Sequence, residues 1–408
     1  MKRAVITGVG ARTPLGRDAA ALVDGIARGQ SAVRFMPDWR EYKSMRCMVG
    51  APAELTDADV KKIPRTNRRS MGRMSILATH AALEALGDAG IAEEAYASGR
   101  LGCIIGSTTG GGESLNNAYE SLLPSKDLAL LTTGKFFQCV SHTATMNVSQ
   151  YLGINGYIMA PAAACASSLH ALGIAYDLIR TGRQDMVLCG GAEELHASVN
   201  ATFDVLYATS SAYNDTPRAT PRPFDKDRDG LVCGEGSGLV VLEEYEHARA
   251  RGAKMYAEVI GFYTCGSGAH ISQSDQTSMA VCMRGALADA HLAPDQIDYV
   301  SAHATATIQG DEAEAATIRD VFGDSVPVSS LKGNLGHTLG ASGGIELIVV
   351  LSMIARSKIW PTLNLESVDD ACGGVYHVTR TIEKKVSTVL KNSFAFGGIN
   401  ASLVCRAL

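Results

Sequence analysis

No two of the ten cysteines in this 408-residue sequence have CxxC spacing, and no group of cysteines and histidines has the spacing of a zinc site. The cysteines are instead dispersed along the chain, several of them inside apolar runs. This distribution argues against a disulfide framework and a structural zinc site, and it is typical of reduced thiols. We therefore expect a cytoplasmic protein whose fold depends on its hydrophobic core.

The sequence also has little that suggests a membrane protein. It begins MKRAVITGVG, which has the pattern of a strand entering a turn rather than of a signal peptide. The most apolar stretch, residues 339–359, is interrupted by Glu346. We therefore expect no transmembrane helix and no membrane partner.

Charged residues make up only 19% of the chain and aromatic residues only 6%, whereas 46% of the residues are hydrophobic and the formal net charge is −5. This composition excludes a disordered chain and indicates a globular α/β protein with a large core. No low-complexity linker divides the sequence. The two halves, residues 1–250 and 251–408, have a similar order of predicted elements, so we expect an internal duplication and one compact unit of two subdomains.

Strand-like and helix-like patterns alternate along the chain, which favours a layered α/β fold. The predicted strands are Arg3–Thr7, Gly102–Ile105, Asp185–Cys189, Gly238–Leu242, Tyr256–Ile260, Tyr299–Ala302, Val326–Ser329 and Ser402–Arg406. The main predicted helices are Ser75–Gly90, Ser167–Thr181, Ser278–Ala290 and Ala341–Arg356. Residues 207–236 form the longest predicted loop, and long ordered loops commonly cover functional sites.

Two local patterns imitate ligand-binding motifs without completing them. The aspartates of residues 225–230 resemble the opening of a calcium loop, but the closing acid, Glu235, falls one place early. The N-terminal glycines resemble a dinucleotide fingerprint, but Thr13 stands where its third glycine belongs. We therefore predict neither a metal ion nor an organic cofactor.

Cys165 is the strongest candidate nucleophile in the sequence. It follows the small residues 162–164 and precedes the apolar stripe of a predicted helix. At a helix N-terminus, unpaired N–H groups and the helix dipole stabilise a thiolate, so we expect the Cys165 pKa to lie below its ordinary value of about 8.5. A small buried thiol that only packs as a hydrophobe is the alternative.

Three later segments carry further candidate residues. His303 follows a predicted strand, at the end where α/β sheets commonly place chemistry. Lys332 and His337 lie in a glycine-rich turn before the apolar helix that contains Glu346, and the lysine and glutamate should pair because either charge alone is costly to bury. The fourth segment is NSFAFGGINASLV, residues 392–404, whose glycines permit a tight turn with N–H groups free to bind an oxyanion.

Residues 61–73 read KKIPRTNRRSMGR and contain six basic residues and no acidic one. In a chain that is acidic overall, this segment is a candidate docking site for an acidic partner protein. A nucleic-acid site is the rival interpretation, but no aromatic residue is interleaved for base stacking. The candidate docking residues are Lys61, Lys62, Arg65, Arg68, Arg69 and Arg73.

The four ordered segments resemble the β-ketoacyl-[acyl-carrier-protein] synthases, specifically their type I and II branch, along essentially the whole chain. The resemblance implies a thiolase-like duplicated five-layer α/β/α/β/α sandwich, normally a homodimer, although a heterodimer with a related subunit is an open alternative. It also implies decarboxylative condensation of a cysteine-bound acyl chain with malonyl-carrier protein, in fatty-acid or polyketide biosynthesis. The acyl carrier protein is the expected partner, and nucleic acid is not.

By this resemblance Cys165 is the nucleophile, His303 and His337 donate hydrogen bonds to the malonyl thioester, and Lys332 orders the pocket. The oxyanion and acyl-gate positions would be Phe396, Ala395 and Thr109, with Glu346 and Glu314 in supporting roles. The chain departs from the family pattern where Ala304 and Ala395 replace glycines, and Ala395 should stiffen the gating loop. The alternatives are a non-catalytic chain-length-factor-like partner subunit and a coenzyme A-dependent acyltransferase of the thiolase fold.

Overall fold

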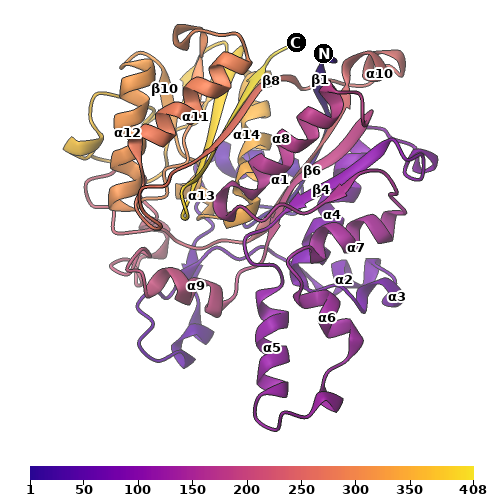
Figure 1. The fold of residues 1–408 in the computed structure, drawn as a ribbon. Coiled ribbons are helices and arrows are strands. Elements are labelled where there is room, and N and C mark those ends of the chain that lie inside the picture. The colour runs from indigo at the N-terminus through magenta and orange to yellow at the C-terminus, as the bar shows by residue number, and fades with distance from the viewer.

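The computed structural model describes residues 1–408 and contains one hydrogen-bonded sheet of eleven strands (Figure 1). The first half of the chain contributes β1 (Ala4–Arg12), β4 (Leu101–Gly106), β5 (Ile158–Met159), β6 (Met186–Glu193) and β7 (Gly236–Glu244). The second half contributes β8 (Ala257–Gly266), β9 (Tyr299–Ser301), β10 (Pro327–Ser329), β12 (Tyr376–His377), β14 (Thr388–Ala395) and β15 (Ile399–Arg406).

The two halves of this sheet have the same topology. The first half is ordered β5-β4-β6-β7-β1 and the second β10-β9-β14-β15-β8, with β12 added at the outer edge. Corresponding pairs also have the same direction, because β7 and β15 are antiparallel to both of their neighbours and the remaining pairs are parallel. The antiparallel pair of β1 and β8 joins the halves. The expected duplication is therefore confirmed.

Helices form three further layers around the two half-sheets. The central layer is α8 (Ser167–Arg180) and α14 (Ser342–Arg356), each of which contacts strands of both halves. The outer layer of the first half is α4 (Arg73–Asp88) and α7 (Thr143–Leu152), and that of the second half is α11 (Gln276–Asp289) with α12 (Ile308–Phe322) beside it. These layers make up the predicted five-layer sandwich.

The central helix α14 explains the most apolar stretch of the sequence. Residues Leu339–Arg356 are long and apolar enough to cross a bilayer, with a mean hydropathy of 1.6, yet most of this segment is buried inside the protein. A helix between two sheets has no solvent-facing side and so carries apolar residues all round. Glu346 is buried within it.

The remaining elements are short or peripheral. The helices are α1 (Ala19–Ala27), α2 (Asp57–Lys62), α3 (Arg65–Arg68), α5 (Gly112–Leu122), α6 (Thr133–Cys139), α9 (Ala197–Asp204), α10 (Tyr245–Ala250) and α13 (Lys332–Leu335). Two small sheets pair β2 (Arg34–Phe35) with β3 (Val49–Gly50) and β11 (Lys358–Ile359) with β13 (Ile382–Glu383). Helices α5 and α6 belong to an arm that projects from the body of the molecule (Figure 1).

Candidate active site

Cys165 lies where the polypeptide turns into the central helix α8. It sits in a 3₁₀ turn, Ala164–Ala166, that leads directly into α8, and its side chain is buried. Ala164 has a φ of 45°, a left-handed conformation that costs a non-glycine residue free energy. This turn places the cysteine at the start of the helix, as the sequence predicts.

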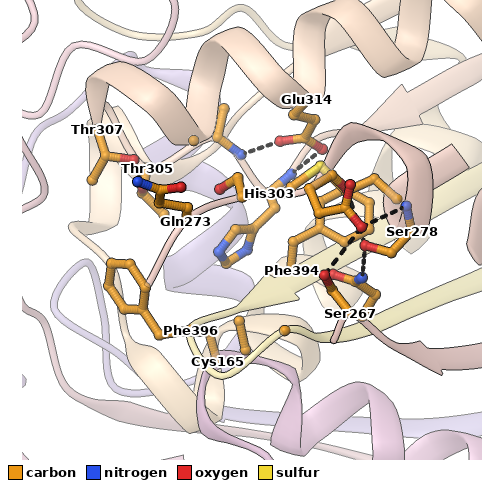
Figure 2. Close-up of a pocket in the computed structure, with 18 of the residues that line it drawn as sticks. Cys165, Ser267, Gln273, Ser278, His303, Thr305, Thr307, Glu314, Phe394 and Phe396 are labelled. Atoms are coloured by element: carbon orange, nitrogen blue, oxygen red, sulfur yellow. Dashed lines mark hydrogen bonds between the residues drawn. The ribbon is translucent and has the colours of Figure 1, made fainter. Parts of the chain in front are cut away.

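The structure brings both predicted histidines to Cys165. The Nε2 atom of His337 lies 2.9 Å from the Cys165 sulfur, and the His303 and His337 rings meet edge to face at a centroid distance of 5.2 Å. The three side chains line one cavity. Phe394 and Phe396 line it beside Cys165 and His303 (Figure 2). Cys165, His303 and His337 therefore share a single site, although the two histidines follow the cysteine by 138 and 172 residues in the sequence.

Burial dominates the electrostatics of this site. It raises the pKa of the Cys165 thiol to about 12, although the charge of Lys332 acts in the opposite direction. The prediction of a lowered Cys165 pKa is therefore wrong, because burial favours the neutral thiol. Burial, with the positive charge of Lys332 next in size, lowers the pKa values of His303 and His337 well below 6.5, so both rings are neutral.

The tautomer of His337 follows from its surroundings. Its Nδ1 atom is buried and has no hydrogen-bond partner in the protein. A proton on Nδ1 would be a buried donor without an acceptor, and such an unsatisfied donor costs about 1–3 kcal/mol. The proton therefore belongs on Nε2, which donates to the Cys165 sulfur.

Two buried carboxylates on α12 hold the loop that begins with His303. The four consecutive N–H groups of residues 303–306 all donate to them. Glu314 accepts from the first two at 2.8 and 2.6 Å, and Asp311 accepts from the last two at 2.9 and 3.1 Å. The supporting position predicted for Glu314 is thus at the histidine loop, whereas Asp311 was not identified as a site residue. Its spacing of three residues from Glu314 places both acids on one face of the helix.

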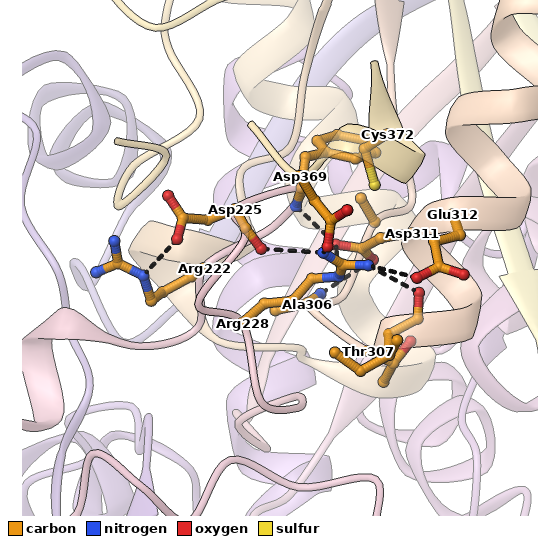
Figure 3. Close-up of polar contacts among 12 residues, drawn as sticks. Arg222, Asp225, Arg228, Ala306, Thr307, Asp311, Glu312, Asp369 and Cys372 are labelled. Atoms are coloured by element: carbon orange, nitrogen blue, oxygen red, sulfur yellow. Dashed lines mark hydrogen bonds and ion pairs between the residues drawn. The ribbon is translucent and has the colours of Figure 1, made fainter. Parts of the chain in front are cut away.

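Asp311 belongs to a larger polar cluster that ties residues 222–229 to α12 (Figure 3). Arg228 is buried and its Nη atoms bind Asp369 at 2.5 Å and Glu312 at 3.1 Å, while its Nε lies 4.0 Å from Asp311. Asp225 accepts a hydrogen bond from the Arg222 Nε at 3.1 Å and further hydrogen bonds from backbone N–H groups of nearby residues. The aspartate that opens the calcium-like pattern is thus an internal hydrogen-bond acceptor.

The expected ion pair between Lys332 and Glu346 is present, and it has a third member. The Lys332 Nζ lies 2.7 Å from one carboxylate oxygen of Glu346, and the Lys391 Nζ lies 2.6 Å from the other. All three side chains are buried. Lys391 was not identified from the sequence.

The turn between β14 and β15 closes the cavity on the side of Cys165. It consists of residues 396–398, in which Gly397 and Gly398 adopt the positive φ values of 85° and 71°. Ala395 and Phe396 line the cavity. The N–H groups of Phe396 and Cys165 donate to no protein acceptor, so both are free to bind a substrate oxygen.

Thr109 lies apart from Ala395 and Phe396, the other predicted acyl-gate residues, and its role stays a prediction. It is exposed on the loop after β4 and does not line the cavity that contains Cys165. The loop is held instead through the preceding residue, because the Thr108 N–H donates to the buried Glu193 at 2.7 Å. Glu193 also accepts the Gly340 N–H at 3.0 Å and so links this loop to the segment that follows His337.

The basic segment divides into two groups. Lys61, Lys62, Arg65 and Arg69 are exposed, and Arg68 is half-buried. Arg73 is different, because its guanidinium forms a 2.6 Å ion pair with the buried Glu235 and also donates to a backbone carbonyl. Its docking role stays a prediction, although its charge is already paired with Glu235.

Comparison with known proteins gives consistent matches over the chain. The model of the β-ketoacyl synthase N-terminal domain matches residues 1–248, and that of the C-terminal domain matches residues 256–366. The chain is 37% identical over 414 residues to 3-oxoacyl-[acyl-carrier-protein] synthase 1 of Escherichia coli (strain K12), and the match covers 100% of both chains.

Two solved structures are also similar. A β-ketoacyl synthase from Burkholderia phymatum STM815 has a TM-score of 0.96 and 43% identity, with 100% of both chains covered. A ketosynthase in complex with a type II PKS acyl-carrier protein has a TM-score of 0.92 and 29% identity, covering 100% of this chain and 99% of that one. The family models and the full-length relative show that this chain belongs to the β-ketoacyl synthases, acyltransferases with the thiolase-like fold.

Proposed function

We propose that this protein condenses an acyl group held on Cys165 with malonyl-acyl carrier protein, releasing carbon dioxide and a β-ketoacyl-carrier protein. The observation that carries the proposal is the 2.9 Å contact between the Cys165 sulfur and the His337 Nε2, with the His303 ring beside it in the same cavity. One nucleophile and two neutral hydrogen-bond donors are the set that this two-step reaction requires.

In the first step the Cys165 thiol gives its proton to solvent and the resulting thiolate attacks the thioester carbonyl of an acyl-carrier protein. The His337 Nε2–H stabilises the developing thiolate, and the free N–H groups of Cys165 and Phe396 receive the oxyanion of the tetrahedral intermediate. The carrier thiolate then leaves and takes up a proton, so the acyl group is bonded to sulfur.

In the second step His303 and His337 donate hydrogen bonds to the thioester carbonyl of the malonyl group. The carbon–carboxylate bond breaks, carbon dioxide leaves, and its electron pair forms an enolate that these donors stabilise. The enolate carbon attacks the acyl-cysteine carbonyl, and Cys165 is released as a thiolate that takes a proton from solvent. Lys332 and Glu346 act indirectly, because their 2.7 Å ion pair is buried and the charge of Lys332 lowers the pKa values of both rings.

The carrier protein is the proposed partner, and the exposed residues Lys61, Lys62, Arg65 and Arg69 are its proposed docking surface. Carrier proteins are acidic, and rim charges of opposite sign accelerate association. One similar structure is a ketosynthase in complex with an acyl-carrier protein, which supports this assignment. We propose that the reaction takes place in the cytoplasm.

A homodimer is the proposed assembly. The edge strand β5 pairs only with β4 and exposes Ile158 and Met159, and unpaired edge strands are surfaces for strand addition. The projecting arm also exposes Phe136 and Tyr119. A second copy would cover these apolar residues, and light scattering of the purified protein tests the dimer. Within each chain, residues 1–250 are the proposed nucleophile-bearing half and 251–408 the proposed histidine-bearing half.

Mass spectrometry of the intact protein tests the activity. Incubation with acyl-carrier protein should add one acyl group to Cys165, and addition of malonyl-carrier protein should remove it as a β-ketoacyl product. The Cys165→Ala variant should acquire no acyl group, because the nucleophile is lost while a side chain of similar size keeps the buried turn filled. Loading from coenzyme A but not from carrier protein, or acyl transfer by the alanine variant, would contradict the proposal.

A further inference from the structure

Lys391 is a buried charge that the reaction steps above do not use. It lies in the middle of β14, its side chain is 1% exposed, and its Nζ donates to the Asn392 carbonyl oxygen at 2.6 Å. A lysine is almost never buried this completely unless it is paired. Its partner is Glu346, whose carboxylate oxygen lies 2.6 Å away.

The strand around Lys391 connects the two histidine-bearing segments. On one side Lys391 binds Glu346, which binds Lys332, five residues before His337. The next residue, Asn392, points to the other side, because successive side chains of a strand alternate. Its Nδ2 donates at 3.2 Å to Glu314, the acid that holds the His303 loop.

The strand is also adjacent to the start of the His303 loop in register. β14 runs parallel to β9, and Lys391 is paired with Ser301, two residues before His303. Asn392 is fixed in turn by Ser402 of β15, whose hydroxyl donates to its Oδ1 at 2.8 Å. The contacts therefore run without a break from Lys332 through Glu346, Lys391 and Asn392 to Glu314.

We propose that Lys391 is a positioning residue for both histidines, which holds Glu346, the ion-pair partner of Lys332 in the His337 segment, and balances the buried charge near the two rings. This inference rests on the proposed function, since it assigns a role in the condensation step. Lys391 lies behind the substrate cavity rather than in its lining, so it acts through other residues.

The charges behind the rings cancel when Lys391 is protonated. Two lysines face two glutamates, and each glutamate is also bound by hydrogen bonds. Replacing Lys391 by methionine leaves a net charge of −1 in this buried region. Both lysines lower the pKa values of His303 and His337, so the loss of one raises both pKa values. The titratable and charged groups that interact with Lys391 are Glu346, Lys332, Glu314, His303 and His337.

The test compares Lys391→Met with the wild-type protein in separated half-reactions. Condensation of the acyl-enzyme with malonyl-carrier protein should fall about tenfold or more in kcat, because a small displacement of catalytic groups has effects of this size. Loading of Cys165 should fall by a smaller factor than condensation, because loading uses only the His337 donor whereas condensation uses both rings. The acid limb of the condensation pH profile should move to higher pH, because the more basic histidines become protonated at higher pH.

Two further variants make the test specific. Lys391→Met/Glu346→Gln restores the charge balance and should move the acid limb back toward its wild-type position. Lys358→Met removes the same charge from the surface pair with Glu383 and should change neither rate nor pH profile. If Lys391→Met does not fold, the double variant is compared with Glu346→Gln, because both lack the Glu346 carboxylate and its pair with Lys332 and differ only at position 391. The double variant should then have the lower kcat of the two.

The outcomes separate the two proposals. If the wild-type protein neither loads nor condenses, the proposed function is wrong. If the wild-type protein condenses and Lys391→Met has the same kcat, the positioning role is overturned. Where Lys391→Met does not fold, a double variant with the same kcat as Glu346→Gln overturns it. A loss of kcat that Lys358→Met reproduces would also overturn it, because the effect would then not belong to the buried site.

Discussion

The separate replacement of the two histidines by alanine tests the mechanism most directly. His337 donates to the Cys165 sulfur, whereas His303 makes no hydrogen bond to it. Both rings face the same cavity, where the malonyl carbonyl must bind. We therefore expect the two variants to differ in loading and to agree in condensation.

The magnitudes follow from the number and type of hydrogen bonds removed. Loss of one donor to a developing oxyanion lowers kcat by about 10²–10³, so each variant should lose about this factor in decarboxylation. Loss of the Nε2–H donor to a thiolate is worth about 1.5–3 kcal/mol at most, which corresponds to about tenfold to a hundredfold in loading for His337→Ala. His303→Ala should load at the wild-type rate.

The assay follows acylation of Cys165 by intact-protein mass and decarboxylation by the release of labelled carbon dioxide from malonyl-carrier protein. Only variants whose unfolding midpoint equals that of the wild-type protein are compared, so that a lost rate does not reflect a lost fold. If His337→Ala loses more in loading than in decarboxylation, His337 acts as the base of Cys165 and the Nε2–H tautomer is wrong. If His303→Ala slows loading as strongly as His337→Ala does, the division of roles is refuted.

Three further outcomes are expected. Because burial raises the Cys165 pKa to about 12, its thiolate fraction, and with it the rate of alkylation by iodoacetamide, should increase about tenfold per pH unit from pH 6 to 9 without a plateau. Arg73→Met should lower the free energy of unfolding by about 3–5 kcal/mol in urea titrations, since it leaves Glu235 buried without its counter-charge. An unchanged KM for carrier protein in this variant would agree with an internal role for Arg73. Zinc ions should inhibit the enzyme reversibly, because the sulfur of Cys165 and the ring nitrogens of His303 and His337 lie within 4.8 Å of one another. Protein acylated on Cys165 beforehand should resist inhibition by zinc. Inhibition that chelators do not reverse would contradict this expectation.

The sequence predicts the parts of the site whose pattern is local. Small residues around Cys165, a histidine after a strand and a glycine-rich turn before an apolar helix are each visible in a short window, and the structure brings all of them together. The centres of most strands of the large sheet are also predicted, although five of the eight predicted strands end too early. For example, β8 continues to Gly266, six residues past the predicted end. Strand ends depend on pairing partners distant in the sequence, which a local pattern does not contain.

The residues that were missed have polar side chains buried by distant partners. β14 contains Lys391 and Asn392 in the interior of the sheet, and this polar pair hides the alternation or the continuous apolar run that marks a strand. Asp311 resembles an ordinary acid in the first turn of a helix until the structure shows that it binds the N–H groups of residues 305 and 306. In each case the signal lies in a contact, not in a spacing.

The incorrect thiolate prediction has the same origin. A helix N-terminus lowers a cysteine pKa when solvent reaches the sulfur, but here the side chain is 4% exposed and desolvation is the largest effect. The same burial keeps His303 and His337 neutral, and in this form one protonated nitrogen of each ring can donate to the malonyl carbonyl while the ring holds no charge. A more solvated site would ionise the cysteine more easily, but it would also let the rings protonate and would weaken their hydrogen bonds to the enolate through water competition. Burial therefore has two effects: it makes loading depend on a hydrogen-bond donor to the sulfur, and it strengthens the hydrogen bonds that stabilise the enolate during decarboxylation.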